Sequence, residues 1–161
     1  MGSRSGDLDP GVLAYLVRSL ALDADGLQRL VNQQSGLLGI SGLSSDMRSL
    51  HAAASSNPDA RLAVALFCYS AAKTLAAQCV ALGGLDMIVF TGGIGEHDAL
   101  LRASIGAHLA WLGVQIDPAR NATHGQADGG LISSSSASRC LVRVLPSQED
   151  AQIAHHAWAL C

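Results

Sequence analysis

The chain has little of what several classes of protein require. Its 161 residues include one lysine, Lys73, and nine arginines that are spread along the chain, and the formal net charge is −3. A nucleic-acid-binding surface usually appears as a cluster or stripe of basic residues. No such cluster occurs in this sequence, so we expect no nucleic acid among its partners.

Long apolar segments are also missing. No uninterrupted apolar run reaches the roughly 18 residues of a membrane-spanning helix, and residues 1–10 are polar and acidic, unlike a secretory signal sequence. We therefore expect a cytoplasmic protein without a membrane partner. The chain is nevertheless 49% apolar and 14% charged, which excludes a disordered chain. At this length it favours a single domain over residues 1–161 with a core. The positive mean hydropathy favours some apolar surface that meets a partner.

The cysteines lack the spacing of a metal or redox motif. Cys68 and Cys79 fall in an apolar helical stretch, Cys140 begins an apolar run, and Cys161 ends the chain. We expect small buried side chains in a reducing compartment. A zinc site or a disulfide is the alternative.

Helical periodicity alternates with two short apolar strands. Asp9 is a suitable cap for the first helix, and Pro10 suits its first position. The pattern predicts an α/β fold that is rich in helices. Helices are expected at about residues 10–20, 23–34, 46–54, 58–82, 97–112 and 148–160, strands at 85–90 and 140–145, a turn or short helix at 117–121, a loop at 35–45, and a mobile surface loop or hairpin at 123–138.

The strongest local pattern is the strand LDMIVF followed by TGGIGE and a helix. Glycines allow a close approach of the backbone, and a helix N-terminus offers unpaired N–H groups to an anion. The segment lacks the Gly-Lys-Ser/Thr of a Walker A loop and the third glycine of the Rossmann fingerprint. It predicts either a phosphate or nucleotide site or a tight strand-to-helix turn.

Few other residues suggest chemistry without further information. The two glutamates, Glu96 and Glu149, both lie near a strand end and a helix start. Each could complement a helix dipole or lie near a metal–phosphate group. The sequence alone favours a helix cap for Asp46 and a solvated side chain for Arg4.

Four segments together resemble one family. MGSRSGDLDP, SGLLGISGLSSDMR, VFTGGIGE and WLGVQIDPARN resemble, in order and spacing, the C-terminal half of acetate and propionate kinases. The resemblance runs from residue 1 to at least residue 154. It implies one domain of the actin/Hsp70/sugar-kinase (ribonuclease H-like) type with a mixed sheet. It also implies ATP and a short carboxylate such as acetate as substrates, ADP and an acyl phosphate as products, Mg²⁺ as cofactor, and a homodimer.

The resemblance also implies roles for particular residues. Arg4 matches the arginine that stabilises the transferring phosphoryl group, as a permanently charged guanidinium can. Glu149 matches a magnesium-associated glutamate. Two segments match nucleotide contacts: Asp46, Met47 and Arg48 in the first, and Gly93, Ile94, Gly95, Glu96 and His97 in the second.

The sequence departs from the family pattern at two places and in its length. His97 stands where the family usually has asparagine, and Ser147-Gln148 replaces the family's Thr-Asn. The family enzymes are also more than twice as long, so we expect a chain that is cut within the family sequence and inactive alone. A dimerisation module without catalysis is one alternative, and an unrelated anion-binding α/β domain is another.

Overall fold

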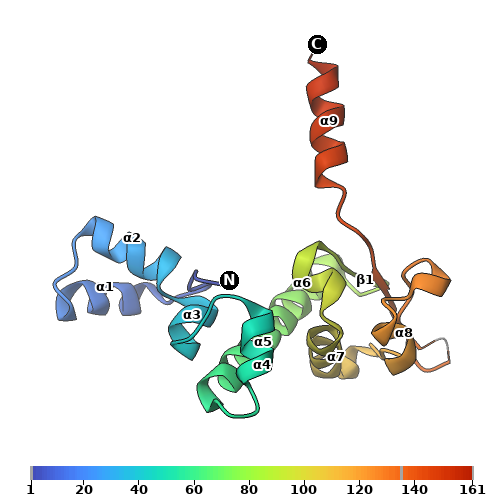
Figure 1. Ribbon diagram of the computed structural model, residues 1–161, viewed down its shortest axis with the longest axis horizontal. Helices are drawn as coiled ribbons and strands as arrows, with labels where there is room; N and C mark the ends of the chain where they lie inside the picture. The colour runs from blue at the N-terminus through green and yellow to red at the C-terminus, as the bar shows by residue number, and fades with distance from the viewer. Residues whose placement is uncertain (1, 135, 161) are drawn as a thin grey trace. The chain divides into compact units, whose positions relative to one another are not determined.

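The computed structural model describes residues 2–134 and 136–160, which divide into two compact units, Met1–Ala71 and Ala72–Cys161 (Figure 1). The helix α5 (Pro58–Leu82) continues from one unit into the other. A single domain over residues 1–161 stays a prediction.

The first unit is helical. Its helices are α1 (Pro10–Ser19), α2 (Ala24–Gln33), α3 (Gly36–Ser41), α4 (Met47–Ala53) and the first part of α5. Asp9 caps α1 by accepting a hydrogen bond from the N–H of Gly11 at 2.7 Å, and Asp23 caps α2 in the same way. The sequence therefore predicted the starts of α1 and α2 correctly.

The predicted loop at residues 35–45 is partly wrong, because α3 lies within it. Gly36 begins this short helix with a φ of 61° and Gly42 ends it in the left-handed region. Between them the side chain of Leu37 is buried. The glycines that suggested a loop are the two ends of a short helix whose apolar residue reaches the core.

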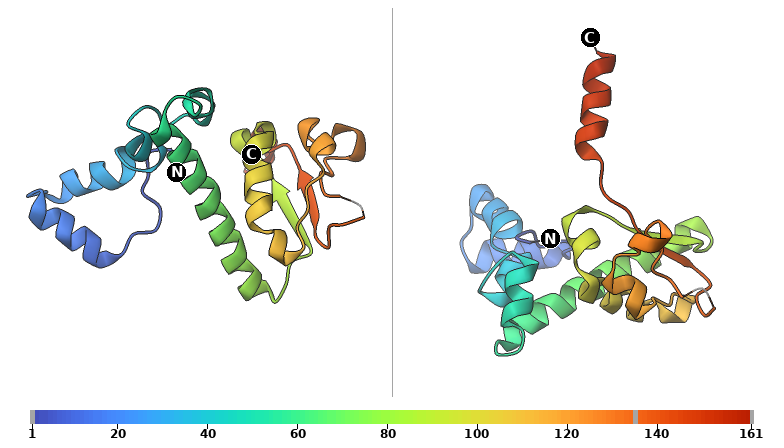
Figure 2. Two further views of the ribbon diagram at one scale, coloured as in Figure 1. Left: turned by 90° about the horizontal axis from the view of Figure 1, so that it is seen from below. Right: turned by 45° about the vertical axis from the view of Figure 1, so that its right-hand side comes forward.

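The second unit is built on two parallel strands, β1 (Met87–Phe90) and β2 (Leu141–Val144). They lie side by side in Figure 2, with Ile88 paired to Val142 and Phe90 paired to Val144. These four side chains are buried, together with Leu101 and Ile105 of α7 and Ile132. An antiparallel bridge between Leu131 and Arg143 adds a mixed character to this small sheet. The helix-rich α/β class is confirmed.

The remaining elements of the second unit follow β1 along the chain. They are α6 (Gly92–His97), α7 (Ala99–His108), η1 (Ala110–Leu112), α8 (Pro118–Ala122), η2 (Gln126–Asp128) and α9 (Glu149–Ala159). The predicted helix at 97–112 starts too late, because α6 begins directly after the strand and Asp98 caps a separate helix α7. Residues 131–133 were expected in a surface loop, but Ile132 and Ser133 are buried beside β2.

α5 bears on the expected absence of a membrane partner, which stays a prediction. Averaged over a window, it is long and apolar enough to cross a membrane by length and composition. Core helices of soluble proteins pass the same test when they are mostly buried, whereas 17% of this window is buried. Ala60, Ala63, Cys68 and Ala72 of α5 are buried within the chain.

Candidate site at the glycine turn

The glycine turn connects the carboxyl end of β1 to α6. Thr91 precedes the helix without a side-chain cap, and Gly92 has a φ of 72°, which favours glycine. Gly93 and Ile94 are the second and third residues of α6, and the N–H groups in the first turn of a helix have no acceptor within that helix. The turn therefore presents free backbone donors at the end of a strand, as an anion site requires.

Two glycines of the turn differ in how closely other atoms approach them. A Cβ added to Gly93 would meet no atom within 4 Å, whereas one added to Gly95 would lie 3.3 Å from the carbonyl carbon of Phe90. Gly93 thus faces open space, and Gly95 is required by close packing against the strand. The glycine pattern combines an open side and a packed side in one short segment.

Glu96 holds this turn to the segment after β2. Its Oε1 accepts hydrogen bonds from the N–H of Gly92 and from the N–H of Ser147, both at 2.8 Å. The bond from Ser147 is the main cause that lowers the pKa of the Glu96 carboxyl; partial burial opposes it, and Gly92 and the nearby His97 add to the lowering. Glu96 is therefore an ionised clamp between two loops that lie 51 residues apart.

Arg102 supports the turn from inside the unit. It is fully buried, and its Nη1 donates to the carbonyl oxygens of Gly95 and Glu96 at 2.8 Å each. Its Nε and Nη2 donate to Asn121 Oδ1 and to the Asn121 carbonyl, and Nη2 also lies 2.9 Å from His124 Nδ1. Burial lowers the pKa of Arg102, while the charge of Asp98 opposes this.

Sequence reasoning missed Arg102. It occupies an ordinary helical position in LLRASIG, where an arginine reads as solvated. The sequence pattern that could have identified Arg102 is its position ten residues after Gly92, in a helix where the nearby residues Leu101 and Ile105 are apolar. An unpaired arginine among core positions is rare, so that position could have been flagged.

His97 borders a hollow beside the turn. A cavity of about 320 Å³ is lined by Glu96, His97, His124, Gly130 and Pro146, among others. The rings of His97 and His124 meet edge to face with centroids 6.3 Å apart. The histidine that departs from the family pattern thus faces a second histidine at the rim of this cavity.

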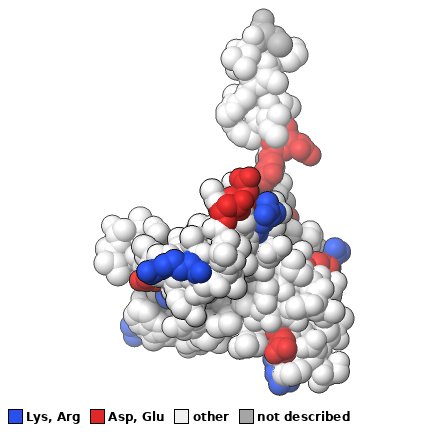
Figure 3. All heavy atoms as spheres, turned by 90° about the vertical axis from the view of Figure 1, so that its left-hand side faces the viewer, with Lys and Arg blue, Asp and Glu red and all other residues white. Residues whose placement is uncertain are grey.

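Glu149 is the first residue of α9 and is exposed. It lies two residues after Ser147, which binds Glu96, so the chain tethers it near the glycine turn. No described residue of α9 is buried, and Figure 1 shows this helix extending away from the strands of its unit. In Figure 3 it is white beyond an acidic first turn.

Arg4 lies in the first unit. Its segment is held by the N–H of Ser5, which donates to the Val31 carbonyl at 2.8 Å, and by Ser3 Oγ, which donates to the Asn32 carbonyl at 3.0 Å. The Arg4 side chain is exposed and borders a cavity of about 420 Å³ that Asp7 and Asn32 also line. The chain is therefore anchored on both sides of Arg4, while the Arg4 side chain is exposed.

Asp46, Met47 and Arg48 open α4 in the same unit. Asp46 accepts a hydrogen bond from Ser49 Oγ at 3.1 Å and pairs with Arg48 Nε at 3.5 Å. Partial burial favours the neutral acid, but these bonds and the Arg48 charge outweigh it and lower the pKa of Asp46. Arg48 is exposed, whereas Met47 is buried and packs in the core. A nucleotide could touch Met47 only through its backbone.

The segments of Arg4 and Asp46 meet within the first unit. A Cβ added to Gly2 would lie 3.0 Å from the carbonyl oxygen of Ser45. The structure thus places the segment that precedes Arg4 against the segment that precedes Asp46, and it separately joins the glycine turn to the segment of Glu149. The individual binding roles of all these residues stay predictions.

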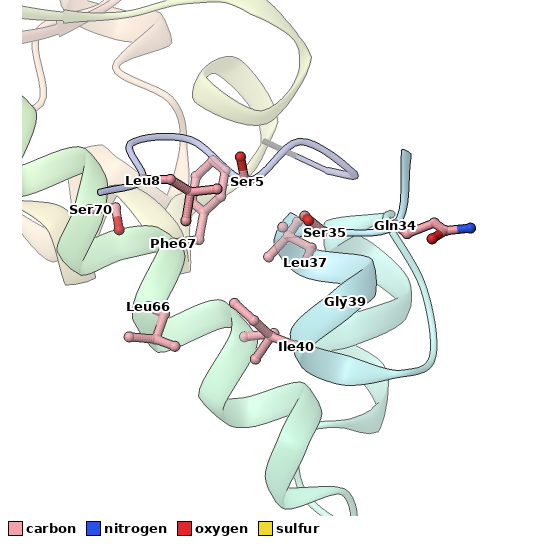
Figure 4. Close-up of a pocket in the computed structure, with 12 residues that line it drawn as sticks. Ser5, Leu8, Gln34, Ser35, Leu37, Gly39, Ile40, Leu66, Phe67 and Ser70 are labelled. Atoms are coloured by element: carbon pink, nitrogen blue, oxygen red, sulfur yellow. The ribbon is translucent and has the colours of Figure 1, made fainter. Parts of the chain in front are cut away.

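The first unit also contains an apolar cavity of about 420 Å³ that none of the predicted site residues lines. Figure 4 shows Leu8, Leu66 and Phe67 on one side and Leu37 and Ile40 on the other, with a few serines at the edge. No charged side chain lines it. Its chemistry does not suit a phosphate.

The fold and the turn define a class: an α/β protein with an open glycine turn after a parallel strand and an internal arginine that fixes the turn. The model of the acetokinase family matches residues 1–155, and the chain belongs to this family. It is 46% identical over 160 residues to an acetate kinase of Rhodopseudomonas palustris (strain CGA009) and 47% identical over 161 residues to one of Ectopseudomonas mendocina.

Solved structures agree with this assignment. The acetate kinase of Porphyromonas gingivalis matches 99% of this chain with a TM-score of 0.87 at 36% identity, and a propionate kinase of Francisella tularensis matches 96% with a TM-score of 0.86 at 37% identity. The chain covers 40% and 38% of those two chains. It likewise spans about 39–40% of the length of the two curated relatives.

Proposed function

We propose that this chain is the nucleotide-binding part of a carboxylate kinase that transfers a phosphoryl group from ATP to a short carboxylate such as acetate. The observation that carries the proposal is the open glycine turn in a member of the acetokinase family. In-line phosphoryl transfer depends on positioning and on charge stabilisation. The residues of this chain offer both kinds of group.

The N–H groups of Gly93 and Ile94 in the first turn of α6 fit a role in holding a phosphate or ribose oxygen. Glu96 and Arg102 fix the shape of the turn, and neither needs to touch the ligand. Arg48 and Arg4 provide exposed guanidinium groups for phosphate oxygens. In this proposal Arg4 stabilises the transferring group and is a catalytic residue.

Magnesium fits the residues present. The described residues contain no group of three His, Cys, Asp or Glu side chains that could hold a metal by themselves. Mg²⁺ commonly keeps several waters and is bound through phosphates and one or two carboxylates. Glu149 would supply such a carboxylate, and bound Mg²⁺ would neutralise phosphate charge. The proposal places the protein in the cytoplasm.

Calorimetric titration with Mg-ADP tests the nucleotide site. We expect binding by the chain and its loss in Gly93→Leu, because the new side chain occupies the open space that the ligand would fill. Gly84→Leu is the matched control, since a Cβ there also meets no atom within 4 Å. Equal affinities for all three proteins would refute the proposed site. Acyl phosphate formation is expected only after the part of an acetate kinase that this chain does not match is added.

A dimerisation module is the second candidate function. The observation that favours it is the exposure of apolar side chains on α5, with Val80 84% and Leu82 76% exposed. A folded domain that leaves such residues uncovered gains free energy when a partner buries them. Dimerisation and nucleotide binding are compatible.

A further inference from the structure

The buried guanidinium of Arg102 uses every N–H group that it has. A guanidinium carries five N–H groups and no acceptor. Nη1 donates to the carbonyl oxygens of Gly95 and Glu96, and Nε donates to Asn121 Oδ1. Nη2 donates to the Asn121 carbonyl and to His124 Nδ1. All five bonds are 2.8 or 2.9 Å long. The glycine turn is thus held by an arginine that has no spare donor.

One of the five acceptors of Arg102 can change its charge. Four of them are oxygens of the backbone or of the Asn121 amide, which do not titrate. The fifth is His124 Nδ1. Because Arg102 can only donate, Nδ1 carries the lone pair, and the neutral ring has its proton on Nε2. A protonated ring has N–H groups on both nitrogens and cannot accept this bond.

The ring of His124 is fixed beside Arg102 by its surroundings. The residue lies between α8 and η2 with a φ of 55°, a left-handed conformation that few residues other than glycine, asparagine and aspartate adopt. Its N–H donates to the Asn121 carbonyl at 3.1 Å, and its half-buried ring meets the ring of His97 edge to face. The ring therefore cannot leave Arg102 without breaking one of these contacts.

We propose that His124 is a positioning residue of the glycine turn, that it acts through Arg102, and that protonation of its ring loosens the turn. A charged ring would take away the acceptor of one Nη2–H and would place a second cation beside the buried guanidinium. When Arg102 moves in response, the carbonyl oxygens of Gly95 and Glu96 lose their donor. Nucleotide affinity is then expected to fall as the pH falls, and this second part rests on the proposed function.

Few other groups near His124 could cause the same dependence on pH. The other charged or titratable side chains on the elements around it are Glu96 and His97 of α6, Asp98 and Arg102 of α7, Arg120 of α8, Asp128 of η2 and Arg143 of β2. Imidazole is the side chain that ordinarily changes its charge between about pH 5 and 8. The pKa of the Glu96 carboxyl is lowered by the bond from Ser147, so Glu96 stays ionised in this range. His97 is therefore the group that an experiment must separate from His124.

Nuclear magnetic resonance of the chain without ligand tests the positioning role. Long-range correlations between ring protons and nitrogens are expected to show the Nε2–H tautomer of His124 at about pH 8. The amide signals of Gly93 and Gly95 are expected to shift with the same pH midpoint as the His124 ring. In His124→Asn these amides should not follow the pH. Asparagine offers Oδ1 in place of Nδ1, does not titrate and tolerates a left-handed φ.

Calorimetric titration with Mg-ADP tests the consequence for the nucleotide. The affinity of the parent is expected to be at least about fivefold lower at about pH 5.5 than at about pH 8, because a buried donor loses its acceptor. His124→Asn should bind as the parent does at the higher pH and should lose this dependence. His124→Phe keeps an aromatic ring against His97 but has no acceptor, so it should bind weakly at both pH values.

His97→Asn distinguishes the two imidazoles. It is expected to keep the pH dependence of the Gly93 and Gly95 amides, since the bond from Arg102 to His124 remains. Loss of that dependence in His97→Asn together with its persistence in His124→Asn would overturn the proposal. Amide signals of the parent that stay constant between about pH 8 and 5.5 would overturn it as well. Amides that follow His124 in a chain that binds no Mg-ADP at any pH would support the positioning role and refute the proposed function.

Discussion

At the scale of single residues, Arg102 determines whether the glycine turn keeps its shape. The carbonyl groups of Gly95 and Glu96 have a buried guanidinium as donor, and Asn121 depends on the same group. A buried acceptor that loses its donor costs about 1–3 kcal/mol. The turn is therefore stabilised by Arg102, which contacts no ligand in the proposed function.

Arg102→Met is expected to lower the free energy of unfolding of the second unit by about 2–4 kcal/mol, because several buried acceptors lose their donors at once. Arg102→Lys keeps the charge and one donor group and should lie between this variant and the parent. Urea denaturation followed by circular dichroism measures both. A Met variant as stable as the parent would contradict the supporting role.

Glu96 predicts how stability depends on pH. Its pKa is lowered in the folded chain, chiefly by the bond from Ser147, so its contribution is present above the unfolded pKa of about 4.3. That contribution is lost as the pH falls through the lower folded pKa. Asp46 has a lowered pKa too and contributes in the same direction.

The melting temperature of the parent should therefore fall between about pH 5 and pH 3 more steeply than that of Glu96→Gln. Glutamine keeps an acceptor oxygen but does not titrate. Asp46→Asn serves as the comparison, because it removes the contribution of Asp46 in the first unit to the pH dependence of stability. Parallel curves for the parent and Glu96→Gln would show that the clamp is not ionised in the folded chain.

The sequence predicted residues whose chemistry is local and missed those whose role needs the fold. Asp9 and Asp46 were predicted as caps because a cap acts within three residues. Arg102 binds Asn121, 19 residues away, and Glu96 binds Ser147, 51 residues away. Neither long-range contact produces a local pattern that could be recognised in the sequence. Glu96 was predicted to contact the nucleotide. In the structure its Oε1 accepts hydrogen bonds from Gly92 and Ser147, so any ligand contact would have to coexist with these two bonds.

At the scale of elements, the junction beside β2 depends on close backbone approach. Gly125 and Gly130 both have positive φ angles, and Gly130 lies against the carbonyl of Val144. A side chain at Gly130 would meet the backbone of the strand itself. The covered edge of β2 therefore requires glycine at this position.

Gly130→Ala is expected to destabilise the second unit by about 2–4 kcal/mol, through a backbone clash and a left-handed φ of 84°. Gly84→Ala is the matched control, because its Cβ would meet open space, and its stability should change by less than about 1 kcal/mol. Thermal unfolding compares the two. Equal melting temperatures would contradict the close approach of Gly130 to the Val144 carbonyl.

Elements were predicted best where one signal dominated. The bounds of α5 agree with the predicted 58–82 because Asn57-Pro58 starts a long apolar repeat and Gly83-Gly84 ends it. The turn at residues 91–98 was harder, since six helical residues with three glycines carry no clear period. The same holds for residues 131–133, whose burial comes from pairing with β2 and not from their serine-rich surroundings.

At the scale of the whole molecule, the exposed apolar side chains of α5 set an expectation for assembly. Val80 and Leu82 lie at the end of that helix with most of their surface exposed. Burying them releases free energy of about 25 cal/mol per Å² of apolar surface. Such residues favour association over an isolated chain.

Light scattering after size exclusion is expected to show a dimer for the parent. Val80→Lys together with Leu82→Lys should shift the equilibrium to the monomer by at least about tenfold, because each charge opposes burial. Leu100→Lys, outside α5, is the control variant. A parent that stays monomeric at all accessible concentrations would remove the dimerisation candidate and leave the nucleotide site unaffected.

α9 is an eleven-residue helix without a buried residue, and isolated helices of this length are marginal in water. The carboxylate of Glu149 sits in its first turn, so its position depends on a coil–helix equilibrium. A cation that binds the helical form must shift that equilibrium, and any contact that orders the helix must tighten the cation in return. If Glu149 holds magnesium as proposed, magnesium affinity and the helix content of α9 are two measurements of one coupled free energy.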